Sequence, residues 1–356
     1  MRVVLHSLDA AQGEKVAAGR GKDFAFPGVF RYHRPAHMKS LLALALLMAL
    51  FHGCTRKDAA PRGTEKAAVA RPVAIPSFDP ARAFQFLHAQ TSFGPRHPNS
   101  VGHERCLEYL EGTLSDLCDT VVLQPFTHPG YGETLRLTNV IARFRAELPA
   151  RILLCAHWDT RPRADRDSSR ARREEPILGA NDGASGVAVL LELATLMKAA
   201  PPPVGVDIVL FDGEDYGLEG DTDNYLLGSR HFVRMKPADY VVRFGILLDM
   251  VGDAALELPR EQFSDRYARD IVDLVWQHAA ALGVGEFLDA PGHDVLDDHV
   301  ILNQAGIRTI DIIDFDYPDP TNRYWHTHQD TPDKCSPQSL GAVGRVLTQV
   351  LYTQTP

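Results

Sequence analysis

From residue 78 onward, apolar positions repeat with two different periods. A spacing of three to four residues indicates helices, at 80–114 with a polar interruption, 184–200, 264–282 and 337–352. Short apolar runs indicate strands, at 121–126, 135–143, 151–157, 206–211, 244–250 and 309–313. The continuous runs are typical of strands buried on both faces. Strands alternating with helices predict one doubly wound α/β domain over 78–356, with a mixed, mostly parallel central sheet flanked by helices.

The first 77 residues lack this pattern. Residues 38–54 read MKSLLALALLMALFHGC, whose apolar run is too short to span a bilayer but is typical of a secretory signal. Its end resembles a bacterial lipoprotein cleavage site, so we expect a lipid on Cys54 and export to the periplasm or cell envelope. The alternatives are a simple signal peptide and an uncleaved membrane anchor. Residues 55–77, rich in Ala, Pro and charge, predict a flexible tether, and we interpret 1–37 as an over-long gene start.

The charge of the chain limits its partners. The formal net charge is −9, and the sequence has no basic run and no aromatic RNA-binding motif. We therefore expect no nucleic-acid partner. The cysteines have no zinc-knuckle spacing.

Ligand-type side chains follow the predicted strands, where an open α/β sheet binds its ligands. They are His157, Asp159, Asp182, Glu214, Asp215, Asp249, Asp297, Asp298, His299, His326 and His328. Each residue alone is more often a helix cap or a surface group. Together, so many carboxylates would cost several kcal/mol in repulsion and desolvation unless a cation joined them. Imidazole nitrogen with carboxylate oxygen is the ligand set of catalytic zinc.

Other catalytic signatures are absent from the sequence. It contains no G-x-S-x-G elbow, no P-loop and no H-E-x-x-H helix. Metal chemistry is therefore the remaining option. A structural calcium site is disfavoured by the two histidine-bearing motifs.

Seven ordered motifs resemble one family. They are AHWDTRP, GANDGASGVAVLLE, FDGEDYG, LLGSRHF, LLDMVGD, DDHV and YWHTHQDTPD. This order resembles the zinc-dependent glutaminyl-peptide cyclotransferases of animals and bacteria, which are related to di-zinc aminopeptidases. The resemblance implies a single zinc-hydrolase-like domain over 78–356. Trp325 before His326, the GSRHF motif and Asp297 favour the cyclotransferase.

The resemblance also implies the roles of individual residues. One zinc per chain would be held by Asp182, Asp215 and His326. Glu214 would be the general acid/base, and Asp249 and Asp297 would complete the catalytic site. Substrate contacts would come from Trp325, from Trp158 and from Asp311, which stands where animal members have a histidine. A second metal at His157 and Asp249 is the arrangement of the related di-zinc peptidases.

The implied reaction converts an N-terminal glutamine of a peptide or protein into pyroglutamate and releases ammonia. One alternative is a di-zinc aminopeptidase, because all five of that family's ligand positions are filled here. The other is a non-catalytic binding ectodomain, which is disfavoured because no ligand is missing.

Overall fold

The computed structural model describes residues 75–355, so the expectations for 1–37, 38–54 and most of the tether 55–77 lie outside the described residues. The helices are α1 (Pro80–Thr91), α2 (Val101–Leu117), α3 (Ser185–Ala199), α4 (Leu227–Met235), α5 (Gln262–Leu282), α6 (Asp298–Gln304) and α7 (Pro337–Tyr352). The strands are β1 (Thr120–Pro129), β2 (Thr134–Phe144), β3 (Arg151–His157), β4 (Gly205–Phe211), β5 (Gly245–Asp249), β6 (Leu258–Arg260), β7 (Phe287–Pro291) and β8 (Thr309–Ile313). Within this range no helix has the length and apolar composition needed to cross a membrane.

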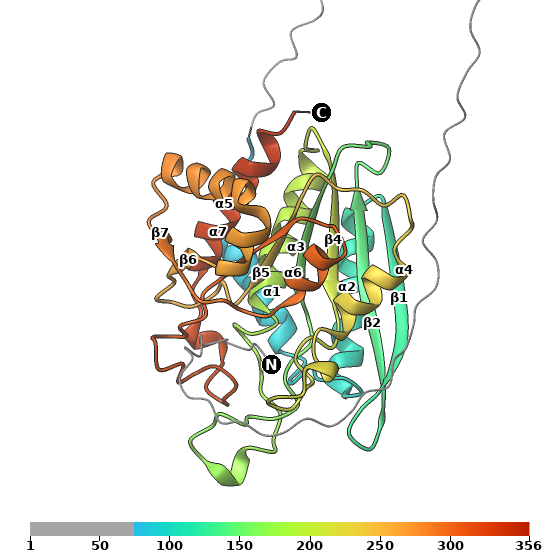
Figure 1. Cartoon of the computed structure of the whole chain (residues 1–356), viewed down its shortest axis with the longest axis vertical. Helices are drawn as coiled ribbons and strands as arrows, with labels where there is room; N and C mark the ends of the chain where they lie inside the picture. The colour runs from blue at the N-terminus through green and yellow to red at the C-terminus, as the bar shows by residue number, and fades with distance from the viewer. Residues whose placement is uncertain (1–74, 356) are drawn as a thin grey trace, which may run out of the picture. The chain divides into compact units, whose positions relative to one another are not determined.

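The central sheet has six strands in the order β1-β2-β4-β3-β5-β8. The strands β4, β3, β5 and β8 run parallel, and β2 pairs antiparallel with both β1 and β4. Helices cover both faces of the sheet (Figure 1). The predicted mixed, mostly parallel sheet with flanking helices is confirmed.

Alternate residues of the parallel strands enter two different cores. In β3, Ile152 and Leu154 face the main core with α1, α3 and α7, while Leu153 and Cys155 face a smaller core with Phe232 of α4. These four residues of β3 are fully buried. Burial on both faces explains why these strands are continuously apolar in the sequence.

The helical pattern at 80–114 forms two helices, α1 and α2, and its predicted polar interruption is a loop that contains Pro95 and Pro98. Proline disfavours helical backbone at the residue before it, which explains the break. Neither α4 nor α6 was predicted, because segments of 9 and 7 residues give too few periods to recognise.

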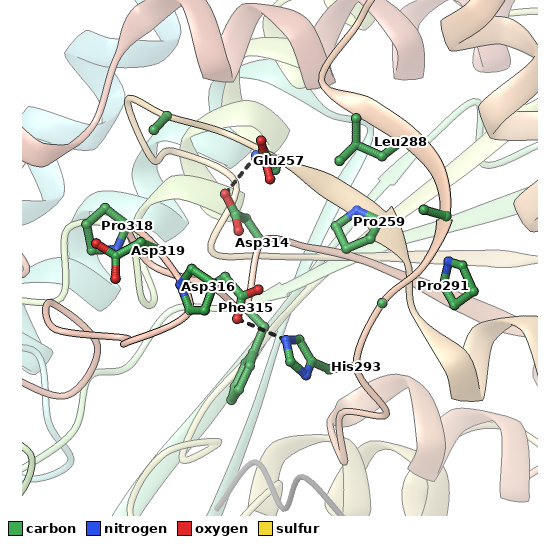
Figure 2. Close-up of a pocket in the computed structure, with 14 residues that line it drawn as sticks. Glu257, Pro259, Leu288, Pro291, His293, Asp314, Phe315, Asp316, Pro318 and Asp319 are labelled. Carbon is green, nitrogen blue, oxygen red and sulfur yellow. Dashed lines mark hydrogen bonds and ion pairs between the residues drawn. The ribbon is translucent and has the colours of Figure 1, made fainter.

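A small parallel sheet of β6 and β7 lies beside the edge of the domain that β8 forms. Between this small sheet and the segment 314–320 that follows β8 there is a pocket of about 550 Å³ (Figure 2). Its lining includes Pro259, Leu288, His293, Asp314 and Phe315.

The close packing of α3 on the sheet gives a prediction about stability. A Cβ atom at Gly186 would lie 2.4 Å from the backbone oxygen of Leu248, which has no room to move. We expect Gly186→Ala to lower the free energy of unfolding by about 1–3 kcal/mol, measured by urea denaturation.

Gly112 of α2 provides the matched control. A Cβ atom there meets nothing within 4 Å, and the residue is exposed. Gly112→Ala should raise the free energy of unfolding by up to about 1 kcal/mol, because alanine favours helix. Equal effects of the two substitutions would contradict the packing argument.

Candidate metal centre

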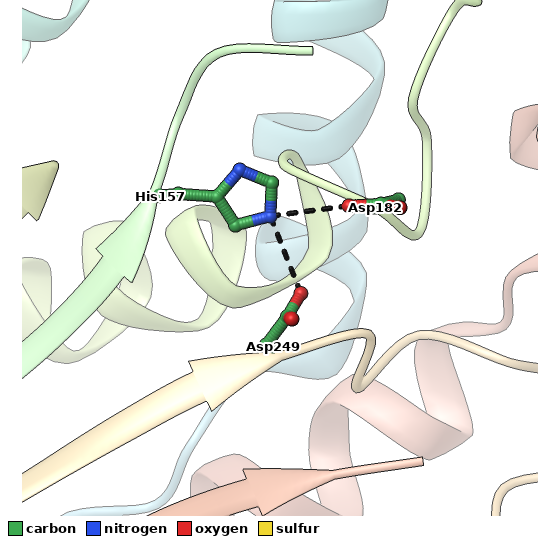
Figure 3. Close-up of side chains that lie close together, drawn as sticks. All are labelled: His157, Asp182 and Asp249. Carbon is green, nitrogen blue, oxygen red and sulfur yellow. Dashed lines mark hydrogen bonds and ion pairs between the residues drawn. The ribbon is translucent and has the colours of Figure 1, made fainter. Parts of the chain in front are cut away.

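Three buried ligand atoms meet where β3 and β5 end. His157 is the last residue of β3, Asp249 is the last residue of β5, and Asp182 lies in the turn before α3. The Nε2 atom of His157 lies 3.2 Å from Asp182 Oδ1 and 3.3 Å from Asp249 Oδ1 (Figure 3). The strand ends thus bring together residues that are 92 positions apart in the chain.

A second cluster shares Asp182 with the first. Its other members are Asp215, in the turn after β4, and His326, in the loop after β8. His326 Nε2 lies 3.3 Å from Asp215 Oδ2 and 3.6 Å from Asp182 Oδ2. The two oxygens of Asp182 therefore face different clusters, and one carboxylate links them.

The spacing of these atoms fits zinc. Bonds of about 2.0–2.1 Å to a tetrahedral zinc ion place neighbouring ligand atoms about 3.3–3.4 Å apart. The four imidazole–carboxylate distances lie at 3.2–3.6 Å. In both clusters the chosen ligand atoms lie within 4.8 Å of one another and all the residues are buried. A histidine and carboxylates in this arrangement are suited to zinc at either position.

The buried carboxylates make the electrostatic environment of the site favourable for a positive charge. Burial lowers the pKa of His157, but the carboxylates of Asp159, Asp182 and Asp249 raise it well above its usual range. Burial raises the pKa of Asp215, yet His326 and Arg161 hold it well below its usual range. Asp215 is therefore ionised and ready to bind a cation.

Arg161 and Asp159 fix the orientation of Asp215. The guanidinium of Arg161 donates to Asp215 Oδ1 at 2.8 Å, which leaves Oδ2 directed at His326. Asp159 accepts the backbone N–H groups of Glu214 at 3.0 Å and Asp215 at 3.3 Å. The two adjacent acids are thus held by a third acid, through their backbone rather than their side chains.

Asp330 fixes the turn that carries Asp182. It accepts the backbone N–H groups of Asn181 at 2.8 Å and Asp182 at 3.1 Å, and the hydroxyl of Tyr317 donates to it at 3.0 Å. Burial and the nearby Asp182 raise the pKa of Asp330 to about 7. Gly183, which directly follows Asp182, has φ +105°, and a Cβ atom there would lie 2.4 Å from the backbone oxygen of Asp159. Only glycine fits this turn.

Glu214 lies beside the clusters without belonging to either. Its side chain is buried, and Oε2 lies 3.9 Å from His157 Nδ1. The neighbouring Asp215 supplies the ligand oxygen. The adjacent acids therefore take separate places, one within a ligand cluster and one next to it.

The remaining predicted site residues are also buried. Asp297 is the N-cap of α6 and accepts the N–H of Asp298 at 2.5 Å. Asp311 lies in β8, with Oδ2 3.8 Å from Nδ1 of His299. The ring of Trp325 stacks on that of His326, with 3.9 Å between centroids. Trp325 therefore covers a candidate ligand.

Trp158 has a different place from the one expected. Its side chain is fully buried in the main core, and its ring stacks on His103 with centroids 4.4 Å apart. Its indole N–H donates to the carbonyl of Thr138 at 3.2 Å. Because no part of it is exposed, the structure places Trp158 as a core residue and not as a pocket wall. A tryptophan beside a ligand strand could serve either purpose, and the sequence did not distinguish them.

Arg161 and Asp330 were not predicted as part of the site. Both lie inside recognised motifs, AHWDTRP and YWHTHQDTPD. The sequence indicated them only as charged residues close to the predicted ligands. This indication is weak, because most such residues are solvated.

Two buried histidine–carboxylate clusters at the carboxyl ends of parallel strands define a metallohydrolase-like α/β protein. Residues 139–351 match the peptidase family M28. The chain belongs to this family.

Solved structures and a curated relative agree with this assignment. The glutaminyl cyclase of Bacteroides thetaiotaomicron bound to N-acetylhistamine is 39% identical, with a TM-score of 0.76, over 79% of this chain and 100% of that one. A Zn-dependent exopeptidase from Parabacteroides distasonis is 36% identical, with a TM-score of 0.76, over 79% and 100%. The glutaminyl-peptide cyclotransferase-like protein of Mus musculus is 25% identical over 284 residues, which are 72% of this chain and 71% of that one.

The contact between Arg161 and Asp215 predicts an effect on metal affinity. Arg161→Met keeps the length of the side chain but leaves Asp215 Oδ1 without its donor. Loss of such a supporting hydrogen bond typically weakens metal binding 10- to 100-fold. Competition with a chelator of known zinc affinity would measure the change.

Arg172→Met is the control, because within residues 75–355 Arg172 forms an ion pair with Glu175 in an exposed segment, away from both clusters. It should bind zinc like the unmodified protein. Equal zinc affinity of the two variants, with both folded by circular dichroism, would show that Arg161 does not position the ligand.

Proposed function

We propose that this protein is a glutaminyl-peptide cyclotransferase, which converts the N-terminal glutamine of peptides or proteins into pyroglutamate and releases ammonia. The observation that carries the proposal is the match to the whole length of a bacterial glutaminyl cyclase at 39% identity. Trp325 over His326 supports it, because a flat ring next to a ligand suits the folded side chain of a glutamine.

The reaction requires one group that moves a proton. The α-amino nitrogen of the glutamine attacks the carbon of its own side-chain amide, and a five-membered ring forms. The attack is intramolecular, so little entropy is lost in bringing the groups together. The amine loses a proton, and the amide nitrogen must gain one before it leaves as ammonia.

Glu214 is placed to transfer this proton. Its carboxylate belongs to neither cluster and lies 3.9 Å from Nδ1 of His157, and Glu214 directly precedes the cluster residue Asp215. It would accept the proton from the amine and deliver it to the departing nitrogen. A bound zinc ion would supply polarisation of the amide carbonyl. Asp249 and Asp297 would line the reacting groups, and Asp311 would contact the substrate.

We propose one zinc per chain, held by Asp182, Asp215 and His326. The first cluster, of His157, Asp182 and Asp249, has a similar spacing and favours a second candidate function, a di-zinc aminopeptidase. An exopeptidase among the similar structures points the same way. The number of zinc ions in purified protein, measured by inductively coupled plasma mass spectrometry, separates the two, since the cyclotransferase needs one ion and the peptidase two.

A peptide that begins with glutamine tests the reaction directly. Mass spectrometry of the product should find the loss of one ammonia from the intact peptide, and a chelator should abolish this change. Loss of the whole N-terminal residue would instead identify an aminopeptidase and refute the proposal.

Two substitutions separate binding of the metal from transfer of the proton. Glu214→Gln should retain zinc and lose about 10²–10⁴-fold in kcat, because it removes the general base. His326→Ala should lose both zinc and activity, because it removes a ligand. Near-normal cyclisation by Glu214→Gln would end the assignment of Glu214.

We also propose that the protein is exported to the cell envelope and carries a lipid on Cys54, which lies outside the described residues. The support is the signal pattern of residues 38–54. In a bacterial host, the unmodified protein should incorporate labelled fatty acid and fractionate with membranes, and Cys54→Ala should do neither. An unlabelled protein, or one whose mature form contains peptides from 1–37, would contradict this.

A further inference from the structure

The pocket beside β8 lies close to the candidate active site. Phe315 lines the pocket, and its ring centroid lies 5.3 Å from that of Trp325, which stacks on His326. The neighbouring Ile313 pairs with the metal-cluster residue Asp249 in the sheet. The pocket is therefore one strand beyond the metal centre, at the same end of the sheet.

The distance between His326 and the pocket matches the length of the few residues that follow the glutamine of a peptide. An extended chain advances about 3.3–3.6 Å per residue. About two to four residues would lead from His326 across Trp325 to Phe315. The volume of about 550 Å³ is within the usual range for a ligand pocket.

The pocket combines apolar walls with acidic groups. Its walls include Pro259, Leu288, Pro291 and Phe315, and its ionisable groups are Glu257, Asp314, Asp316, Asp319 and His293. Neither Lys nor Arg is among its lining residues. Figure 2 draws Glu257, Asp314 and Asp316 with the apolar side chains around the same hollow.

The carboxylates of the pocket differ in whether a positively charged or hydrogen-bonding partner already lies beside them. Asp316 pairs with His293 at 2.9 Å, and Asp319 pairs with Arg323 at 3.3 Å. Asp314 accepts the backbone N–H of Glu257 at 2.9 Å, and burial together with Asp253 and Asp316 raises its pKa to about 8. The side chain of Glu257 is exposed at the rim. A cation in the pocket would therefore meet Glu257 directly and would favour ionised Asp314.

We infer that this pocket binds a basic side chain, Lys or Arg, located two to four residues after the N-terminal glutamine of the substrate. The aliphatic stem of such a side chain packs on proline and leucine, while its charged head faces the carboxylates. An acidic side chain at the same position meets like charge. This inference rests on the proposed function, because it assigns sequence specificity to the cyclotransferase.

The test compares peptides of equal length that begin with glutamine and carry Lys, Ala or Glu at the third, fourth or fifth position. At one of these positions kcat/KM should be about three- to tenfold higher for Lys than for Glu, with Ala between them. The ratio should fall as the salt concentration rises, because the charges are near the surface.

Two variants assign the preference to the pocket. In Glu257→Gln and in Asp316→Asn, each normalised to the Ala peptide, the Lys-to-Glu ratio should fall towards one. Both side chains are substantially exposed, so the core is spared. Glu108→Gln removes one exposed acid from α2 and should keep the full ratio, which controls for the net charge.

The outcomes separate the two proposals. If no peptide loses ammonia, the proposed function fails and the inference fails with it. If all peptides are cyclised with equal kcat/KM, or if the Lys preference persists in both pocket variants, the function stands and the inference is overturned.

Discussion

The repulsion among buried carboxylates is the constraint on which this structure depends. Asp182 lies close to Asp249 in one cluster and to Asp215 in the other, and each of the three is at most 3% exposed. Burying several such charges without a cation would cost several kcal/mol. The fold keeps them together because strand ends and tight turns leave them no other position. A divalent ion would offset this repulsion. The fold thus positions the carboxylates for the ion, and the ion would stabilise the fold.

Buried charged side chains hold the site in place by forming hydrogen bonds to the backbone of the turns that carry the ligands. Asp159 and Asp330 each accept two backbone N–H groups from the turns that carry the ligands. Arg96, fully buried, donates to the carbonyls of Trp158, Leu178 and Gly179 at 2.8–3.2 Å. It thereby ties the loop before α2 to the two segments that flank the first cluster. Such an outer layer determines ligand orientation as much as the ligands themselves.

The sequence predicted the parts of this molecule that follow from periodicity. The buried strands β3 and β5 were visible because both faces are covered, and their ends correctly located His157 and Asp249. It did not predict α4 and α6, whose length and position depend on tertiary packing. Nor did it separate Trp325, which covers a ligand, from Trp158, which fills the core. Both follow the same pattern of an aromatic residue beside a histidine, and only the packing against His103 and Thr138 distinguishes them.

The shared carboxylate of Asp182 relates the two chemistries that this fold can carry. With both clusters filled, Asp182 would help to hold two ions, which would supply a metal-bound water as the nucleophile for hydrolysis. Cyclisation needs no external water, because the substrate supplies its own nucleophile. A site for that reaction gains from excluding water, which would otherwise compete for the amide. Glu214 at 1% exposure and Trp325 at 7% satisfy that requirement. The burial of the proton carrier therefore suits a reaction in which the substrate supplies its own nucleophile.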